Sequence, residues 1–266
     1  MLRSHIETID VSRGGQRYVS DAVSGEETID CATISVERLG TTDRNQMFSL
    51  YETYYDATDR DGFERDLSEK DGVVVVRRNK AIIGFSTYLV RRHAIGAETI
   101  HYLFSGDTVL DASRWGDPVL LRGFFRAAGA AKARIKGRLF WFPIIKGHRT
   151  FRILPNFFRE FVPAIDGDAK PGLVEVRDAI ARARYGRSFD PITGLVDFGP
   201  SQGHLRDEWA DAKEIAVRNR FAAFFLKTNP GHNRGVELAC LAELDVKNLK
   251  RYGAASFAKG LADASA

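Results

Sequence analysis

Cysteine is scarce in this sequence, and its scarcity excludes two kinds of protein. Only Cys31 and Cys240 occur among 266 residues, far apart and without neighbouring cysteine or histidine pairs. Two isolated cysteines exclude a disulfide framework, and their spacing lacks the ligand pattern of a zinc site. We therefore interpret both residues as reduced, buried thiols and expect no bound metal.

Long apolar runs are also missing. The longest, residues 73–76 and 81–85, fall far short of the about twenty residues that span a bilayer, and no apolar run follows the first basic residues. The sequence therefore predicts neither membrane insertion nor a secretory signal, and we expect a cytoplasmic location. The nucleotide-binding patterns GxGxxG and GxxxxGK[ST] do not occur either, which excludes the common Rossmann and P-loop sites.

What the sequence does contain is an ordinary globular composition with an uneven charge. Hydrophobic residues make up 44% and the net charge is only +4, but residues 112–160 hold eleven lysines or arginines against two acids. A local excess of cations attracts anionic partners, here a phosphorylated cofactor, an acidic carrier protein or RNA. A solvated basic surface without a ligand is the alternative.

The clearest structural pattern is a β-hairpin followed by a third strand. The run GVVVVRRNKAIIGFSTYLV places two β-branched segments around the turn residues 78–80, and a linker is expected at 91–97. Residues 99–110, TIHYLFSGDTVL, then predict the third strand. A helix over 118–135 follows, with Asp117 as its N-cap and Pro118 in its first turn.

The second half of the chain predicts a broken strand, more helix and another hairpin. Pro143 lies within the strand 138–145, so this strand must be at an edge or leave its neighbour there. A helix is expected around 148–161, and a hairpin from 221–227 and 236–244. Residues 1–38 are interpreted as an N-terminal arm or an added edge element, and 39–266 as one domain with an insertion at 163–218.

This order of elements resembles the GNAT acyltransferase family, near its acyl-homoserine-lactone synthase branch. The residues that carry the resemblance are GVVVVRRNKAIIGFSTYLV, TIHYLFSGDTVL with SRWGDPVLLRGFFRAAG, and LFWFPIIKGHRTFRILPNFF. The resemblance implies a mixed α/β fold with a mostly antiparallel central sheet, helices on both faces, splayed fourth and fifth strands, and an insertion before the terminal hairpin. It also implies an acyltransferase that takes its acyl group from a phosphopantetheine thioester.

In that family the turn after the fourth strand grips the donor's pyrophosphate with backbone amides at a helix N-terminus. Here this stretch lacks the second glycine of the motif, and Asp117 and Pro118 stand at the helix start. The donor is therefore left open between acyl-CoA and an acyl carrier protein, which would be an acidic partner. The donor-binding candidates are Arg114, Trp115, Gly116, Val119, Lys146, His148 and Arg149.

Acyl transfer to an amine needs a base for the ammonium proton and an acid for the leaving thiolate. Asp107 is the first candidate for the base and His101 the second. Strand alternation places both on one face with Ser105, unless a bulge at Gly106 shifts the register. The tyrosine that the family uses as the acid has no counterpart in the helix that follows. The available substitutes, which spacing cannot separate, are Tyr51, Tyr54, Tyr55 and Tyr102.

Three hypotheses follow for the function. The first is an N-acyltransferase acting on a small-molecule amine, and the second is a non-catalytic module that binds an acyl thioester or an acidic protein. The third, least favoured, is an RNA-binding protein or an aminoacyl-tRNA-dependent transferase. Eight phenylalanines between 124 and 161 form either an acyl-chain tunnel or, as their spacing favours, core. The oligomeric state is not encoded in any pattern of the sequence.

Overall fold

The computed structural model describes residues 17–19, 28–199, 204–206 and 213–265. The helices are α1 (Thr41–Tyr54), α2 (Arg60–Ser68), α3 (Val119–Ala133), α4 (His148–Phe151), α5 (Ile153–Phe157), α6 (Pro171–Tyr185), α8 (Lys213–Arg218), α9 (Arg220–Thr228) and α10 (Arg251–Ser265). Short 3-10 turns are η1 (Val36–Arg38), η2 (Ala112–Arg114), η3 (Gly186–Ser188) and η4 (His232–Arg234). The strands are β1 (Arg17–Val19), β2 (Ile29–Ser35), β3 (Tyr55–Asp56), β4 (Gly72–Arg78), β5 (Ala81–Ile95), β6 (Glu98–Leu110), β7 (Leu139–Trp141), β8 (Ile144–Ile145), β9 (Phe189–Asp190), β10 (Leu195–Val196), β11 (His204–Leu205), β12 (Glu237–Ala239) and β13 (Ala242–Glu243).

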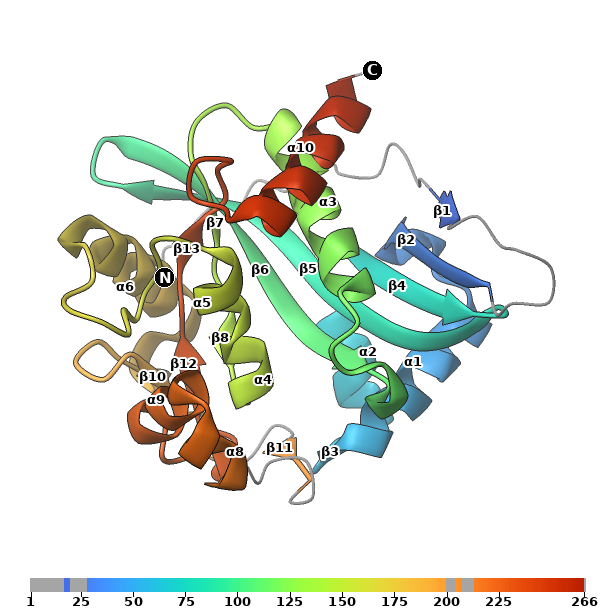
Figure 1. Cartoon of the computed structure of the whole chain (residues 1–266), viewed down its shortest axis with the longest axis horizontal. Helices are drawn as coiled ribbons and strands as arrows, with labels where there is room; N and C mark the ends of the chain where they lie inside the picture. The colour runs from blue at the N-terminus through green and yellow to red at the C-terminus, as the bar shows by residue number, and fades with distance from the viewer. Residues whose placement is uncertain (1–16, 20–27, 200–203, 207–212, 266) are drawn as a thin grey trace.

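A seven-stranded sheet forms the centre of the molecule, in the order β1-β2-β4-β5-β6-β7-β13 (Figure 1). Every neighbouring pair in it is antiparallel except β6 and β7, which are parallel. The sequence prediction of a mixed α/β fold with a mostly antiparallel sheet is confirmed. A four-stranded sheet, β8-β12-β10-β9, and a two-stranded pair, β11-β3, lie beside it.

The predicted hairpin is present as β4 and β5, with the left-handed residues Asn79 and Lys80 in its turn. The linker expected at 91–97 is wrong, because β5 stays paired with β6 as far as Ile95 opposite Glu98. Half-buried and exposed residues alternate over this stretch, so one face of this β-ribbon remains solvated. The sequence carries no break until Gly96, whose φ of +57° makes the turn.

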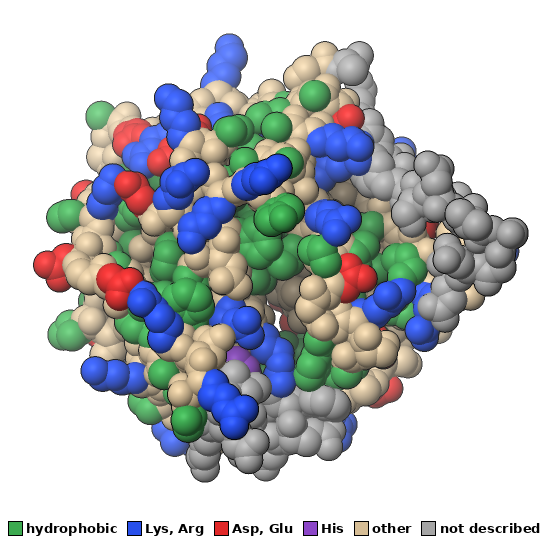
Figure 2. Space-filling model, viewed as in Figure 1, with side chains coloured by type: hydrophobic (Ala, Val, Ile, Leu, Met, Phe, Trp, Pro, Cys, Tyr) green, Lys and Arg blue, Asp and Glu red, His purple; other side chains and the backbone are tan. Residues whose placement is uncertain are grey.

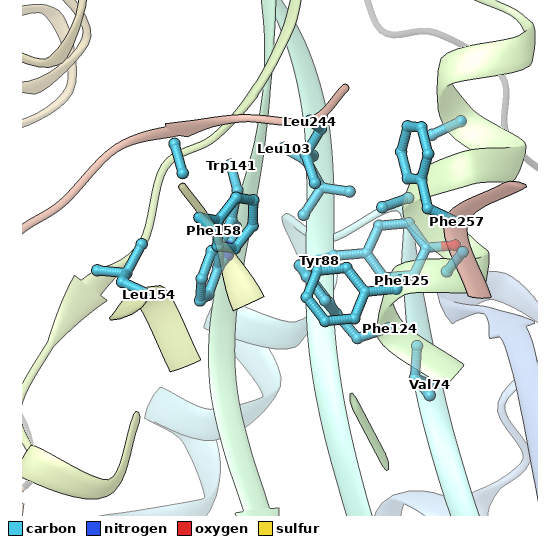
Figure 3. Close-up of a cluster of buried hydrophobic side chains, with 14 of the residues drawn as sticks. Val74, Tyr88, Leu103, Phe124, Phe125, Trp141, Leu154, Phe158, Leu244 and Phe257 are labelled. Carbon is cyan, nitrogen blue, oxygen red and sulfur yellow. The ribbon is translucent and has the colours of Figure 1, made fainter. Parts of the chain in front are cut away.

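Helices cover both faces of the sheet, as the sequence predicted (Figure 1). On one face α3 and α10 pack on each other and on the sheet, and aromatic side chains of α3, β7 and α5 fill the core there (Figure 3). The ring centroids of Phe124 and Trp141 are 5.3 Å apart, and those of Trp141 and Phe158 are 5.6 Å apart. Such close packing supports the core interpretation of these aromatics over a tunnel. On the other face, α1 and α2 cover β4 and β5, and α6 covers β6 and β7.

Pro143 divides the predicted strand 138–145 into two short strands that follow different partners. β7 pairs with β6 only from His101 to Leu103, and Phe142 N donates the last bond to Leu103 O at 2.9 Å. Beyond the proline, β8 pairs with β12 instead. Because proline cannot donate to the ladder, β8 leaves β6 at this point, and the expectation of splayed strands is confirmed.

Other sequence expectations are corrected by the structure. The segment 221–227, expected as a strand, is the helix α9, because Asn219 accepts from the amides of Phe221 and Ala222 and so caps it. The helix expected at 148–161 is two short helices, α4 and α5. Within the predicted N-terminal arm, Ile29–Ser35 pair along their whole length with β4 and belong to the sheet; residues 1–16 and 20–27 lie outside the described residues.

Cys31 and Cys240 are both free and buried, which confirms the interpretation as thiols. Burial raises the pKa of Cys31 to about 12 and also raises that of Cys240. Within the described ranges, no helix combines the length and the apolar character that crossing a bilayer requires.

Candidate active site

The separation of β6 from β8 leaves a gap in the sheet beyond Phe104. Over the described chain no strand pairs with this side of β6 from Phe104 to Leu110. Figure 2 shows the surface hollowed in this region, between α3 and α4, with lysine or arginine and histidine side chains along its lower edge. The gap is thus bordered on one side by the unpaired edge of β6 and at its mouth by positively charged side chains.

A β-bulge lies in β6 directly at this gap. On β5, Tyr88 pairs with Ser105, and Ser86 pairs with Thr108. The single β5 residue between them therefore opposes both Gly106 and Asp107 of β6. The bulge that the sequence analysis left open at Gly106 is therefore present. A bulge puts consecutive side chains on one face, and it separates Ser105 from Asp107.

Asp107 lies at the floor of the gap near four charged or phenolic groups, Asp66, Lys146, Lys70 and Tyr51. Burial and the charge of Asp66 raise its pKa from 3.8 to about 6, while Lys146, Lys70 and a hydrogen bond from Tyr51 oppose the rise. A carboxyl group with this pKa is largely ionised at pH 7 and gains a proton readily. It therefore has the acid–base properties of a general base that works near neutral pH.

Tyr51 on α1 is the tyrosine that the structure brings to Asp107. Its hydroxyl hydrogen-bonds the carboxylate, and burial together with the charge of Asp107 raises its pKa, so the phenol keeps its proton. Tyr55 stacks on it at 4.6 Å between ring centroids. The hydroxyl of Tyr54 instead accepts from Ala112 N at 2.7 Å. The sequence could not choose among these residues, because the packing of α1 on the sheet and the bulge in β6 decide which ring reaches the carboxylate.

Two ion pairs, each with one buried partner, lie near Asp107. Lys146 Nζ lies 3.5 Å from Glu237 Oε1 of β12, and Lys70 Nζ lies 2.5 Å from Asp66 Oδ1 at the end of α2. Glu237 is 6% exposed and Lys70 is 5% exposed. Burial raises the pKa of Glu237, and Lys146 counteracts it. Asp107 therefore titrates in a field of fixed charges rather than in bulk water.

The donor-binding candidates from two distant parts of the chain meet across the mouth of the gap. The guanidinium of Arg149 on α4 lies 4.1 Å from the ring centroid of Trp115, which follows η2. A hydrogen bond fixes the Trp115 ring, because its Nε1 donates to Leu110 O, at the end of β6, at 2.8 Å. Arg114 lies beside it, 3.7 Å from Asp117. The two predicted donor-binding segments are therefore in contact with each other in the structure, and their role in donor binding stays a prediction.

The start of α3 is capped by the protein itself. Asp117 Oδ1 accepts from Val119 N at 2.9 Å, and Pro118 has no amide hydrogen to offer. Gly116 has a φ of +96°, and a side chain there would meet only open space. The carboxylate of Asp117 therefore occupies the position at which a helix N-terminus attracts an anion. This terminus does not fit a pyrophosphate as the resemblance implies.

The cations near α4 fit an anion better. His148 is buried, and burial and the charges of Arg149 and Arg152 lower its pKa to about 4, so it is neutral at pH 7. The Nε2 atom of His148 and the Nε atom of Arg152 are buried, and neither has a partner among the described residues. The buried Nε2 of His148 and Nε of Arg152 thus offer hydrogen-bonding capacity in the segment that also carries Lys146 and Arg149.

The structure does not bring His101 and Ser105 to Asp107. His101 lies near the start of β6, six residues and about 20 Å along the strand from Asp107. Ser105 Oγ accepts from Trp141 Nε1 at 2.9 Å on the opposite face of the sheet. Both candidates were chosen by simple alternation, which the bulge invalidates.

The sequence analysis did not single out Lys70, Glu237 or Arg184, although all three line the face of the sheet that carries Asp107. Of the three, Glu237 interrupts an apolar stretch that is buried in the structure, and a charged residue in such a stretch is a usable signal. Lys70 and Arg184 lie in polar stretches of the sequence, which give no such signal. No group of three or more histidine, cysteine, aspartate or glutamate residues suited to a metal ion occurs in the part of the chain that the structure describes.

Comparison with known proteins adds a weak likeness to acyltransferases. No protein-family model matches the chain, and no curated protein matches it. Among solved structures, an aminoglycoside N-acetyltransferase AAC(6')-Iy in complex with CoA is similar, with 11% identity and a TM-score of 0.35 over 44% of this chain and 78% of that one. A conserved protein of Enterococcus faecalis, described as a probable N-acyltransferase, has 12% identity and a TM-score of 0.38 over 49% of this chain and 33% of its own. Likenesses this weak decide nothing about function, which has to be inferred from the site itself.

Proposed function

We propose that the protein is a GNAT-like N-acyltransferase that moves an acyl group from a phosphopantetheine thioester to an amine. The observation that carries the proposal is the position of Asp107, whose pKa is raised to about 6, at a bulge beside the unpaired edge of β6. The gap offers an extended donor arm a strand edge to pair with, as an added β-strand would. The cations at Lys146 and Arg149 lie where the donor's phosphate groups would enter.

The chemistry follows from the groups at the floor of the gap. Asp107 accepts a proton from the substrate ammonium, and the free amine attacks the thioester carbonyl. The new carbon–nitrogen bond forms as the carbon–sulfur bond breaks, and the thiolate takes a proton from its donor. The nitrogen loses its second proton in the same step, and that proton restores the donor. Tyr51 is our candidate for that proton donor, because its phenol stays protonated and touches Asp107.

The test is thiol release from a panel of acyl-CoA and acyl-carrier-protein thioesters in the presence of mixed amines. Asp107→Asn should reduce turnover by about 100-fold or more, because it removes the base. Glu98→Gln is the matched control, since Glu98 is an exposed carboxylate at the far end of the same strand. Equal loss in both variants, or full activity in Asp107→Asn, would refute the assignment.

A second candidate function is a non-catalytic module that binds the thioester. The capped start of α3 favours it, because Asp117 repels a phosphate at the position where the family grips the donor. A thioester that raises Tm without any release of thiol would support this candidate. Thiol release together with a rise in Tm would support the transferase.

A further inference from the structure

Arg184 on α6 faces the same side of β6 as Asp107. Its Cζ lies 4.6 Å from the ring centroid of Phe104, and its Nη1 donates to the hydroxyl of Tyr102 at 3.4 Å. α6 belongs to the segment 163–218, which lies outside the stretches that resemble the acyltransferase family. The guanidinium is therefore an addition of this chain to the face that carries the base.

Lys70 lies between Arg184 and Asp107 on this face of β6, near both Phe104 and Asp107. Its Nζ lies 5.7 Å from the same Phe104 ring, and a side chain built on Gly106 would meet its Cε at 2.7 Å. Its charge also acts on Asp107. A row of polar groups thus runs along β6 from Arg184 past Lys70 to Asp107.

The charge of Arg184 is not neutralised by the protein in the ranges that the structure describes. No described carboxylate lies within 4.0 Å of it, whereas Arg177 on the same helix pairs with Asp178 at 2.7 Å. The Nε of Arg184 is buried without a hydrogen-bond partner among the described residues, and the hydroxyl of Tyr185 interacts with the same guanidinium. Buried donors usually have partners, so a fixed guanidinium with spare donors is a site for an anionic group.

The two ends of this row set the class of molecule that would bridge them. Arg184 contacts the face at Phe104, and Asp107 lies three residues further along β6. A guanidinium binds a carboxylate, and the carboxylate of Asp107 accepts a proton from an ammonium group. A molecule that carries both groups, as an amino acid does, suits this arrangement.

We propose that Arg184 binds the carboxylate of the acceptor, so that the amine donated to Asp107 is that of an amino acid. The inference rests on the proposed acyl transfer and names its acceptor class. The amino acid's ammonium gives its proton to Asp107, its nitrogen forms the amide bond as the thioester carbon–sulfur bond breaks, and the thiolate is protonated. Arg184 stays charged throughout and only positions the acceptor.

The experiment compares each of a set of L-amino acids with its decarboxylated amine and its carboxamide as acceptors. Arg184→Gln should raise KM for amino acids by about 10- to 100-fold, because it removes charge-assisted hydrogen bonds, and should change KM for the decarboxylated amines little. Arg184→Lys should restore part of the loss. Arg182→Gln on the exposed side of α6 is the matched control and should leave both values unchanged.

A second readout separates this proposal from the proposed function. Calorimetric titration of the protein with the same amino acids, without any donor, should show binding that Arg184→Gln weakens and Arg182→Gln does not, even if no thiol is released. Turnover of decarboxylated amines as fast as of amino acids would overturn the proposal but leave the transferase standing. So would a preference for phosphate-bearing amines, or equal KM changes for all acceptors in a folded Arg184→Gln variant.

Discussion

Replacing Asp107 by asparagine should make the fold more stable while it stops turnover. The pKa of Asp107 is higher in the folded protein, about 6, than the 3.8 of a free side chain. The folded state therefore binds more protons than the unfolded chain between these values, and ionisation of Asp107 weakens folding as the pH rises. The penalty is absent below about pH 4 and complete above about pH 6.

The magnitude follows from the size of the rise. Moving the pKa from 3.8 to about 6 corresponds to about 3 kcal/mol. Asp107 keeps some contact with solvent at the floor of the gap, so we expect a gain of about 2 kcal/mol and a rise in Tm of about 5 °C at pH 7.5.

Urea denaturation of both proteins at pH 4 and pH 7.5 measures the effect. The two free energies of unfolding should agree at pH 4 and differ at pH 7.5, with the variant more stable. An Asp107→Asn protein that is less stable at pH 7.5, or a difference that does not change with pH, would refute the described environment. Activity of the unmodified protein should rise with pH through about 6, as the base loses its proton.

Three further variants test the rest of the site. Ser105→Ala should lower the free energy of unfolding by about 1–3 kcal/mol in urea, because Trp141 Nε1 loses a buried acceptor, and should leave kcat/KM unchanged; a loss of turnover at full stability would return Ser105 to the chemistry. Trp115→Ala removes the ring that lies 4.1 Å from Arg149 and should raise the donor KM about fivefold at constant kcat. Asp117→Ser keeps a capping oxygen without the charge and should lower KM for acyl-CoA by about two- to fivefold, whereas an unchanged KM would place the phosphates away from α3.

The local elements of this fold are largely encoded in short stretches of sequence. The β-branched runs around Asn79 predicted the central hairpin, and Asp117 before Pro118 predicted the start of α3 to within one or two residues. Pro143 predicted where the sheet opens, since a residue without an amide hydrogen ends a ladder wherever the chain folds. These patterns depend on the chemistry of neighbouring residues alone.

The candidate site depended on contacts that no short pattern encodes. The sequence named Asp107, but it could not place the bulge, which arises because β6 holds one residue more than β5 between two well-paired stretches. Pairing of distant strands set that register, and the register took Ser105 away from Asp107. It also decided that Tyr51, rather than another tyrosine, reaches the carboxylate.

The helix α9 shows the same division. Its phenylalanines suit a strand as well as a helix, and the cap at Asn219 together with burial of Phe225 in the core selects the helix. Sequence alone thus determined the central sheet segments, the opening at Pro143 and one catalytic candidate. Only the tertiary structure brought Lys70, Arg184 and Glu237 to the same face of β6, because charges that far apart in the chain become neighbours only through long-range packing.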